Sequence, residues 1–369
     1  MKFTSSLYCA ALALAGVPAS IALAADAAPA PTAAEQAATP RPTPRPTPTA
    51  QPIEPIAFPG NGLAHHDFLY SGEWDTRNPT ETMFLVRGGK VVWKYEIPDK
   101  DPRNGETSEF SDMHLLSNGD IVFAYKTGWR KIDKEGRLIY DFYAPKSGDG
   151  PRDWTEVHTA QPIGMDRVMY MVNGLPAKLY IFNIKTNKIE MEQVVRTKEP
   201  VDQRSIHGQF RNVRMTKAGT FLISHMNLGK VIEYDKDWKE LWSVDAPSVW
   251  HAVRLHNGNT LVAGNQNAWV RELNPKGELV WELKDGDIPP YKINSIHQAH
   301  RLANGNTVIC NWTARVHKVD WPSIVQVIEV TPDKKVVWAF REWTSPDLGP
   351  SSLIQLLDEP GKAEEMDLQ

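Results

Sequence analysis

Residues 251–283 read HAVRLHNGNTLVAGNQNAWVRELNPKGELVWEL, four short apolar or alternating segments separated by turn sequences. Asn257-Gly258 lies between the first two segments, and Asn-Gly is a strong hairpin signal because a type I′ turn needs two residues with positive φ. The run from Asn274 to Gly277 separates the last two segments. The stretch therefore predicts one small antiparallel sheet of four strands.

The same four-segment pattern recurs along the chain. Its closing segments read GKVVW, GRLIY, NKIEM, KELW, GELVW and KKVVW, and they end at Trp93, Tyr140, Met191, Trp242, Trp281 and Trp338, in steps of 47, 51, 51, 39 and 57 residues. β-Rich units at a period of about 50 residues indicate a propeller, in which each blade packs only on its neighbours. We predict an all-β fold, a six-bladed β-propeller of four-stranded blades. A seventh blade would have to lie in the longest step, around Val316 to Ile328, which reads as a long loop.

The first blade lacks an innermost strand at its N-terminal end. Blades two to six begin near Ser108, Thr155, Ser205, Ser248 and Ser295, whereas the first begins directly with DFLYSGEW as its second strand. The segment SSLIQLLDE, residues 351–359, resembles the innermost segments. We therefore expect the C-terminal strand to complete the first blade, which leaves no free sheet edge inside the ring.

The N-terminal region has the composition of a targeting segment followed by a spacer. A positively charged start, an apolar Ala/Leu stretch and a small-x-small sequence ending at Ala24 predict a signal peptide over residues 1–24. Residues 25–57 are rich in Ala, Pro and Thr and are expected to form a disordered linker, so the propeller domain is residues 58–369. We expect a periplasmic or secreted protein, and no later stretch is long and apolar enough for a transmembrane segment.

Charge and cysteine content restrict the partners and cofactors. The net charge is −4 and no block of Lys or Arg stands out, so no nucleic-acid partner is expected. Cys310 is the single cysteine outside the predicted signal peptide, which excludes an internal disulfide. No spacing typical of a zinc site is present, and His65-His66 would point to opposite faces on an extended strand. We predict no cofactor, neither PQQ nor a metal, and leave open a metal bridged by histidines of different blades.

The direction of the strands sorts the loops into two faces. In each blade the first and third turns lie on one face, which carries short solvated turns, and the remaining loops lie on the other face beside the central channel. The second face collects seven of the eleven histidines, together with charged side chains that include Glu73, Asp112, Lys126 and Glu156. Because side chains from every blade converge at a channel mouth, we place the functional site there.

The residue types at this mouth suit an anionic or sugar-like ligand. Arginine binds carboxylate or sulfate through paired hydrogen bonds, tryptophan stacks on sugar rings, and histidine can be a nucleophile or a general acid or base near neutral pH. The candidate catalytic residues are His207, His251, His297 and His300. The candidate ligand-binding residues are His114, His158, Arg211, His225, Trp250, Asn265, Asn311 and Trp312. A structural hydrogen bond is the alternative for each, and we assign Arg254, Arg301 and the repeated tryptophans to packing.

The phrases HAVRLHNGNTLVAG and HQAHRLANGNTVICN, with the GxxxW endings, resemble the arylsulfotransferase-like and quinoprotein-like (PQQ-like) propeller group over about residues 65 to 360. The resemblance implies six blades and a channel histidine that is transiently sulfated, with nearby His and Arg binding the sulfate. His207, His251, His297, His300 and Arg211 match these residue types. The chain departs from the sulfotransferases by lacking their N-terminal β-domain, and from quinone-dependent dehydrogenases by lacking eight blades and an adjacent cysteine pair.

Three functional hypotheses follow. The first is an exported enzyme acting on an anionic carbohydrate or aryl ester by histidine-based lyase, hydrolase or sulfotransferase-like chemistry. The second is a non-catalytic propeller that binds a carbohydrate or an envelope protein partner. The third is a structural assembly module. Convergence of the named His and Arg side chains in an open pocket would favour the first two.

Overall fold

The computed structural model describes residues 53, 55–146, 154–199 and 202–368. The predicted signal peptide, residues 1–24, and residues 25–52 and 54 of the predicted linker lie outside this part of the chain. Residues 48–369 form one compact unit, and the description below concerns this unit. Among the described residues, no helix is long and apolar enough to cross a membrane.

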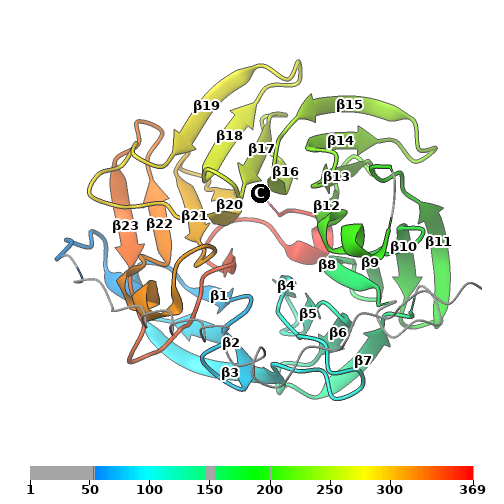
Figure 1. Ribbon diagram of the computed structural model, residues 1–369, viewed down its shortest axis with the longest axis horizontal. Helices are drawn as coiled ribbons and strands as arrows, with labels where there is room; N and C mark the ends of the chain where they lie inside the picture. Colours follow the sequence, from blue (N-terminus) through cyan, green and yellow to red (C-terminus); the bar gives the residue numbers. More distant parts are fainter. Residues whose placement is uncertain (1–52, 54, 147–153, 200–201, 369) are drawn as a thin grey trace, which may run out of the picture. The chain divides into compact units, whose positions relative to one another are not determined.

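The unit is a six-bladed β-propeller of four-stranded antiparallel sheets, as predicted (Figure 1). From the centre outward, blade 1 contains β24 (Leu353–Leu356), β1 (Phe68–Ser71), β2 (Thr80–Arg87) and β3 (Lys90–Pro98), and blade 2 contains β4 (Asp112–Leu115), β5 (Ile121–Ala124), β6 (Gly128–Ile132) and β7 (Leu138–Tyr143). Blade 3 contains β8 (Glu156–Ile163), β9 (Arg167–Asn173), β10 (Lys178–Asn183) and β11 (Lys188–Val194), and blade 4 contains β12 (Phe210–Met215), β13 (Phe221–His225), β14 (Lys230–Tyr234) and β15 (Glu240–Asp245). Blade 5 contains β16 (Val249–Arg254), β17 (Thr260–Gly264), β18 (Trp269–Leu273) and β19 (Leu279–Lys284), and blade 6 contains β20 (Ile296–Arg301), β21 (Thr307–Asn311), β22 (Val327–Val330) and β23 (Val336–Phe340).

The C-terminal strand closes the ring. β24 pairs antiparallel with β1, with Phe68 opposite Leu356 and Ser71 opposite Leu353. This confirms the predicted completion of the first blade. The longest repeat step contains a short 3₁₀ helix, η4 (Lys318–Ser323), between β21 and β22, and no additional blade.

The hairpin turns differ in detail from the predicted type I′ geometry. Gly258 has a φ of 84°, but Asn257 is not among the residues with positive φ. The Asn257 side chain accepts a hydrogen bond of 2.9 Å from the backbone N–H of Asn259, and Leu255 and Asn259 close the loop through a 2.8 Å backbone bond. The asparagine therefore stabilises a longer loop in which only the glycine adopts the left-handed conformation.

Two blade junctions share a charged cluster, which we call an interblade clasp. In each clasp a glutamate on the third strand lies opposite the repeated tryptophan on the fourth, and an arginine from the innermost strand of the next blade binds the glutamate and lies over the tryptophan ring. The residues are Glu233, Trp242 and Arg254 between blades 4 and 5, and Glu272, Trp281 and Arg301 between blades 5 and 6. These contacts agree with the structural role assigned to both arginines and to the tryptophans.

Beyond β24, the C-terminal segment 359–368 crosses the face that carries the innermost hairpin turns (Figure 1). Its carboxylates and backbone bond to turns of five blades, at Ser117, Gly164, Lys217, His256 and Ala303. Ala363 and Leu368 pack into the interblade core. The segment therefore covers the end of the channel opposite the predicted mouth, and the sequence patterns did not predict this.

Candidate functional site

The innermost strands of blades 3 to 6 each carry a β-bulge close to their start. The register shifts lie between Val157 and Thr159, Phe210 and Val213, Val249 and His251, and Ile296 and Ala299. A bulge inserts an extra residue and changes the direction of the side chains beside it. For this reason neighbouring residues such as Trp250 and His251 both line the channel.

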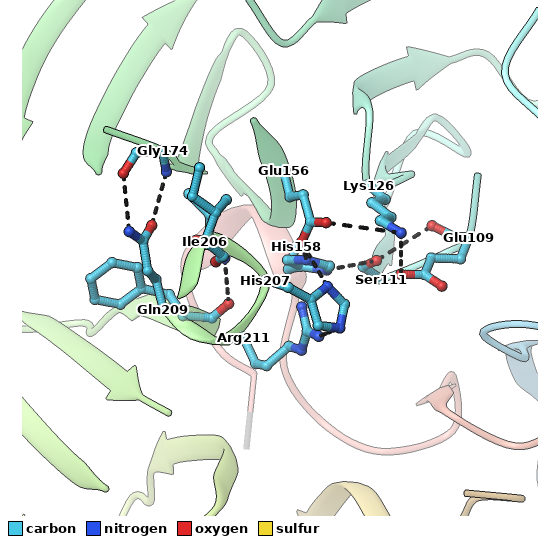
Figure 2. Close-up of polar contacts among 12 residues, drawn as sticks. Glu109, Ser111, Lys126, Glu156, His158, Gly174, Ile206, His207, Gln209 and Arg211 are labelled. Atoms are coloured by element: carbon cyan, nitrogen blue, oxygen red, sulfur yellow. Dashed lines mark hydrogen bonds and ion pairs between the residues drawn. The ribbon is translucent and has the colours of Figure 1, made fainter. Parts of the chain in front are cut away.

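Glu156 is the central acceptor of the channel mouth (Figure 2). One of its oxygens lies 2.9 Å from Nε2 of His158 and 2.8 Å from Nδ1 of His207, and the other lies 3.9 Å from Nζ of Lys126. Burial opposes ionisation, but the hydrogen bonds from the two histidines keep the pKa of Glu156 well below its usual value. A carboxylate only accepts hydrogen bonds, so both histidines donate to it.

His207 belongs to a well-anchored 3₁₀ helix, η3 (Gln203–Gly208), directly before β12. Asp202 and Ser205 form a capping box at its N-terminus. At its other end the Gln209 amide bonds to both the N–H and the C=O of Gly174, at 2.9 and 3.0 Å (Figure 2). The His207 side chain is nevertheless 55% exposed, so a ligand entering the mouth meets an imidazole that is fixed but accessible.

Arg211 is the most unusual cation of the mouth. It is 5% exposed, its guanidinium lies 4.6 Å from the ring centre of Trp250, and its Nη2 donates to Nε2 of His207. The Nε and Nη1 atoms of Arg211 are buried and have no hydrogen-bond acceptor among the described residues. Buried donors without an acceptor are costly, so this guanidinium has the capacity to bind an anionic group in the channel.

A second carboxylate, Glu73, lies on the opposite side of the mouth. It accepts a 2.8 Å bond from Nε2 of His297, while its backbone C=O accepts a 3.0 Å bond from the Trp312 indole. Burial opposes ionisation, but the charge and hydrogen bond of His297 lower the pKa of Glu73. Ser111 Oγ lies 3.3 Å from Glu73 and 3.2 Å from His158, so a continuous chain of polar contacts joins Glu73 to Glu156.

Two carboxylate–histidine sets at the mouth have ligand atoms within 4.8 Å of one another: Glu156, His158 and His207, and Glu73, Glu109 and His158. Lys126 Nζ lies about equally far from Glu109 and Glu156, at 4.0 and 3.9 Å, and so supplies positive charge between them. Burial and the neighbouring Glu73 charge raise the pKa of Glu109. Burial and Arg211 lower the pKa of His158 to about 3, which leaves it neutral. Lys126 and Arg211 thus supply positive charge beside the carboxylates of the mouth.

A deeper layer of polar residues lies below the mouth. Asp112 forms a bidentate ion pair with Arg214, at 2.7 and 2.8 Å, and lies 3.2 Å from His114. Burial and the charge of Arg214 lower the pKa of His251, whose Nδ1 has no partner among the described residues. These groups separate two cavities that share Arg214, His251 and Gln298.

The two cavities occupy successive parts of the channel. The one at the mouth is small and is lined by residues that include Glu73, His158, Arg211, Trp250 and His297. The other is larger, with His114 and His300 in its walls and the C-terminal segment 359–368 contributing much of its lining. Ligand access is therefore expected from the side of the mouth.

The structure brings most of the predicted site residues to the channel. Those that line a cavity are His114, His158, Arg211, Trp250, His251, His297 and His300, while His207 and Trp312 contact this group directly. Both tryptophans are nearly buried, and Arg211 covers part of Trp250. The tryptophan exposed on this face is Trp74, which follows Glu73.

Three predicted ligand-binding residues do not line either cavity. His225 is buried in blade 4 between Phe210 and Tyr234. The Asn311 amide bonds to the backbone C=O of Lys292 and Val325, and Asn265 is a buried residue of the loop after β17. All three follow or end a second strand, one position further from the channel than the innermost strand, and this explains why they lie outside the channel.

The sequence patterns did not single out Glu109, Ser111 or Arg214. Ser111 was passed over because it directly precedes β4, and Arg214 because it lies three residues beyond Arg211 on the same strand. The bulge in β12 lies between these two arginines and lets both reach the channel. The sequence did contain a signal for this pair, namely two arginines three residues apart at the start of an innermost strand.

The chain was compared with known proteins, and no family model and no curated protein matches it. A structure of a protein of unknown function from Bacteroides caccae is similar over 78% of this chain and 98% of that chain, with 22% sequence identity and a TM-score of 0.64. BamB from Moraxella catarrhalis is similar over 63% of this chain and 67% of its own (13% identity, TM-score 0.41). Virginiamycin B lyase from Staphylococcus aureus, in a catalytically inactive form, is similar over 76% and 86% (11% identity, TM-score 0.48). The similarity to the Bacteroides caccae structure is one of fold alone, and the arylsulfotransferase-like resemblance remains a prediction.

Proposed function

We propose that this propeller binds the carboxylate or sulfate group of an anionic carbohydrate or aryl ester at Arg211 in the channel mouth. The observation that carries the proposal is the buried guanidinium whose Nε and Nη1 atoms have no acceptor among the described residues, beside the small cavity at the mouth. Each of these two atoms can donate one charge-assisted hydrogen bond to a carboxylate or sulfate, and the second N–H of Nη2 can complete a paired contact with either of them. Exposed Trp74 is the candidate surface for the rest of the ligand.

The same mouth has the parts for acid–base chemistry. Glu156 accepts a hydrogen bond from Nδ1–H of His207, so Nε2 carries the lone pair, which accepts from Nη2 of Arg211 in this structure. When Arg211 donates to a bound anion instead, a histidine oriented by a carboxylate in this way can take a proton from a ligand hydroxyl or water, or act as the nucleophile. We assign this role to His207, with Glu156 as the group that orients it.

The predicted signal peptide places this activity in the periplasm or outside the cell, where anionic glycans are exposed. Binding without turnover is the alternative, because the mouth could serve recognition of a carbohydrate or an envelope protein alone. His251 lines both cavities, whereas His300 lines the deeper one, so the predicted catalytic role of His300 would require the ligand to extend past Arg214.

The test compares anionic and neutral ligands on tag-free protein. Uronic-acid oligosaccharides, 4-nitrophenyl sulfate and a neutral oligosaccharide are titrated by calorimetry, and turnover is followed by released 4-nitrophenol or new chain ends. Arg211→Gln should weaken anion binding by about 30-fold or more, since a desolvated charge-assisted pair is worth about 2 kcal/mol or more. The matched control is Arg204→Gln, in the 3₁₀ helix η3 that precedes β12 and 92% exposed, which should bind as wild type.

The variant His207→Gln distinguishes catalysis at the mouth from binding alone. Retained binding with lost turnover supports catalysis, and a wild type that binds but never turns over supports recognition alone. Equal affinity of wild type and Arg211→Gln for every anionic ligand would overturn the proposed site.

A further inference from the structure

The junction between blades 6 and 1 departs from the interblade clasps. Glu329 on β22 lies opposite Trp338 on β23, as in the other two clasps. In place of an arginine, two imidazoles lie beside them: the His65 ring stacks on Trp338 at 5.4 Å, and the His66 ring meets it edge-on at 4.9 Å. In the two clasps an arginine guanidinium lies beside the glutamate and the tryptophan, so the fold favours a positive charge beside Glu329 and Trp338 as well.

Both imidazoles direct a nitrogen at the same carboxylate oxygen. Nε2 of His66 lies 3.1 Å and Nε2 of His65 lies 3.4 Å from Oε2 of Glu329, and one ligand atom from each of the three residues lies within 4.8 Å of the others. The expectation that adjacent histidines point apart was wrong. It assumed an extended strand, whereas β1 begins at Phe68 and His65 has helical backbone angles at the end of η2 (Gly62–Ala64).

Asp358 sets the proton position on His66. Its carboxylate lies 2.8 Å from Nδ1 of His66, so this nitrogen donates, and in the neutral ring Nε2 is then an acceptor. An acceptor nitrogen 3.1 Å from a carboxylate oxygen is unfavourable unless a cation lies between them or the ring is protonated.

We propose that His65, His66 and Glu329 bind a divalent transition-metal ion of the zinc class. Zinc bound to nitrogen and oxygen at about 2.0–2.2 Å in a tetrahedron separates its ligands by roughly 3.3–3.5 Å, close to the observed 3.1 and 3.4 Å. Two imidazoles favour zinc, cobalt or nickel over magnesium or calcium, which prefer oxygen ligands. A carboxylate that orients a metal-binding histidine, as Asp358 does, is typical of such sites.

The location gives the metal a role in closing the ring. His65 and His66 precede β1, Glu329 belongs to blade 6, and Asp358 follows β24. The ion would therefore connect the segments before β1 and after β24 to blade 6. At two of the other junctions an arginine side chain supplies the positive charge. His65 is 29% exposed, so water can complete the coordination.

The experiment uses tag-free full-length protein treated with a chelator and then titrated with Zn²⁺ by calorimetry, with Co²⁺ absorption reporting tetrahedral coordination. Wild type should bind one ion per chain and melt at higher temperature with the ion than without it. His65→Ala and Glu329→Gln should lose this binding and the thermal shift. Asp358→Asn keeps all three ligands and should bind about 10- to 100-fold more weakly.

Two controls locate the ion. His256→Ala removes a surface histidine that pairs with Asp367, and it should bind Zn²⁺ as wild type does. His207→Ala disrupts the carboxylate–histidine sets at the mouth and should also retain the ion. Absence of stoichiometric binding in wild type would overturn the proposal and leave protonated His66 as the cation of this junction, and binding that survives His65→Ala but not His207→Ala would overturn it as well.

Discussion

Arg211 at the channel mouth and Arg254 in the clasp between blades 4 and 5 have similar surroundings but different roles. Each guanidinium lies over a tryptophan, at 4.6 and 5.2 Å. Arg254 donates to Thr260, to the backbone of Gly258 and to Glu233. Arg211 donates to one histidine, and two of its buried nitrogen atoms have no acceptor in the part of the chain that the structure describes.

The difference shows that residue type alone does not identify a functional site. Arginine, tryptophan and glutamate occur in both regions, and the number of satisfied hydrogen bonds separates them. Arg254 donates to three acceptors and Arg211 to one. Buried donors without a partner among the described residues also occur in the clasps, at Nε1 of Trp242 and Nε of Arg301, so the proposal for Arg211 depends on its position beside the mouth cavity as well. The channel also excludes water more fully, since Arg254 retains 21% side-chain exposure against 5% residue exposure for Arg211.

The largest effect should come from the buried ion pair of the channel. Asp112→Asn leaves Arg214 without its counter-charge, and breaking a buried pair in this way costs about 3–5 kcal/mol of unfolding free energy. Glu272→Gln makes the same chemical change in the clasp between blades 5 and 6, where the pair is slightly more exposed and Glu272 keeps hydrogen bonds from Asn257 and Asn259, and it should cost less, about 1–2 kcal/mol. Urea denaturation of both variants measures the difference. Equal losses would mean that the two regions do not differ in solvation.

The second effect is on the dependence of stability on pH. Burial, with Arg211, lowers the pKa of His158 to about 3, and burial lowers that of His225 to about 3 as well. Between about pH 6.5 and 3 the unfolded chain binds protons that these folded residues do not, so stability should fall with decreasing pH by up to about 1.4 kcal/mol per pH unit for each histidine. Urea denaturation at several pH values measures the slope.

His225→Gln removes one of these histidines without touching the channel and should reduce the slope below pH 6.5. Hydrogen exchange should show the inner strands of blades 3 and 4 losing protection in acid. An unchanged slope in His225→Gln would show that this histidine is protonated in the folded protein.

The fold could be predicted because its signals are local and repeated. The period of the tryptophan endings and the Asn-Gly turns depend on short segments, and the missing innermost strand of blade 1 had a visible counterpart in residues 351–359. Strand direction then placed the histidines on the correct face. Within that face, His225 and Asn311 could not be distinguished from His251, because all three lie near the mouth end of a strand.

The site was less predictable because it depends on bulges and on contacts between distant segments. The bulges that turn Arg211 and Arg214 into the channel have no sequence signature in a strand of six residues. The C-terminal segment 359–368 has no repeat to identify it, although it lines the deeper cavity. Convergence of His65 and His66 required one residue with helical backbone angles where the pattern suggested an extended strand.

The smallest expected effects come from replacing each of the two arginines by lysine. Arg254→Lys keeps the charge but loses the planar group that contacts Trp242, Thr260 and Gly258, and it should lower the unfolding free energy by about 1 kcal/mol. Ligand binding should be unchanged, because the clasp faces neither cavity of the channel.

Arg211→Lys should change stability little and weaken binding, since an ammonium cannot form the two parallel bonds that an anionic group accepts from a guanidinium. Thermal unfolding and calorimetry on the two variants measure both quantities. A loss of ligand affinity in Arg254→Lys would show that the clasps also shape the site, and the distinction between satisfied and unsatisfied arginines would then fail.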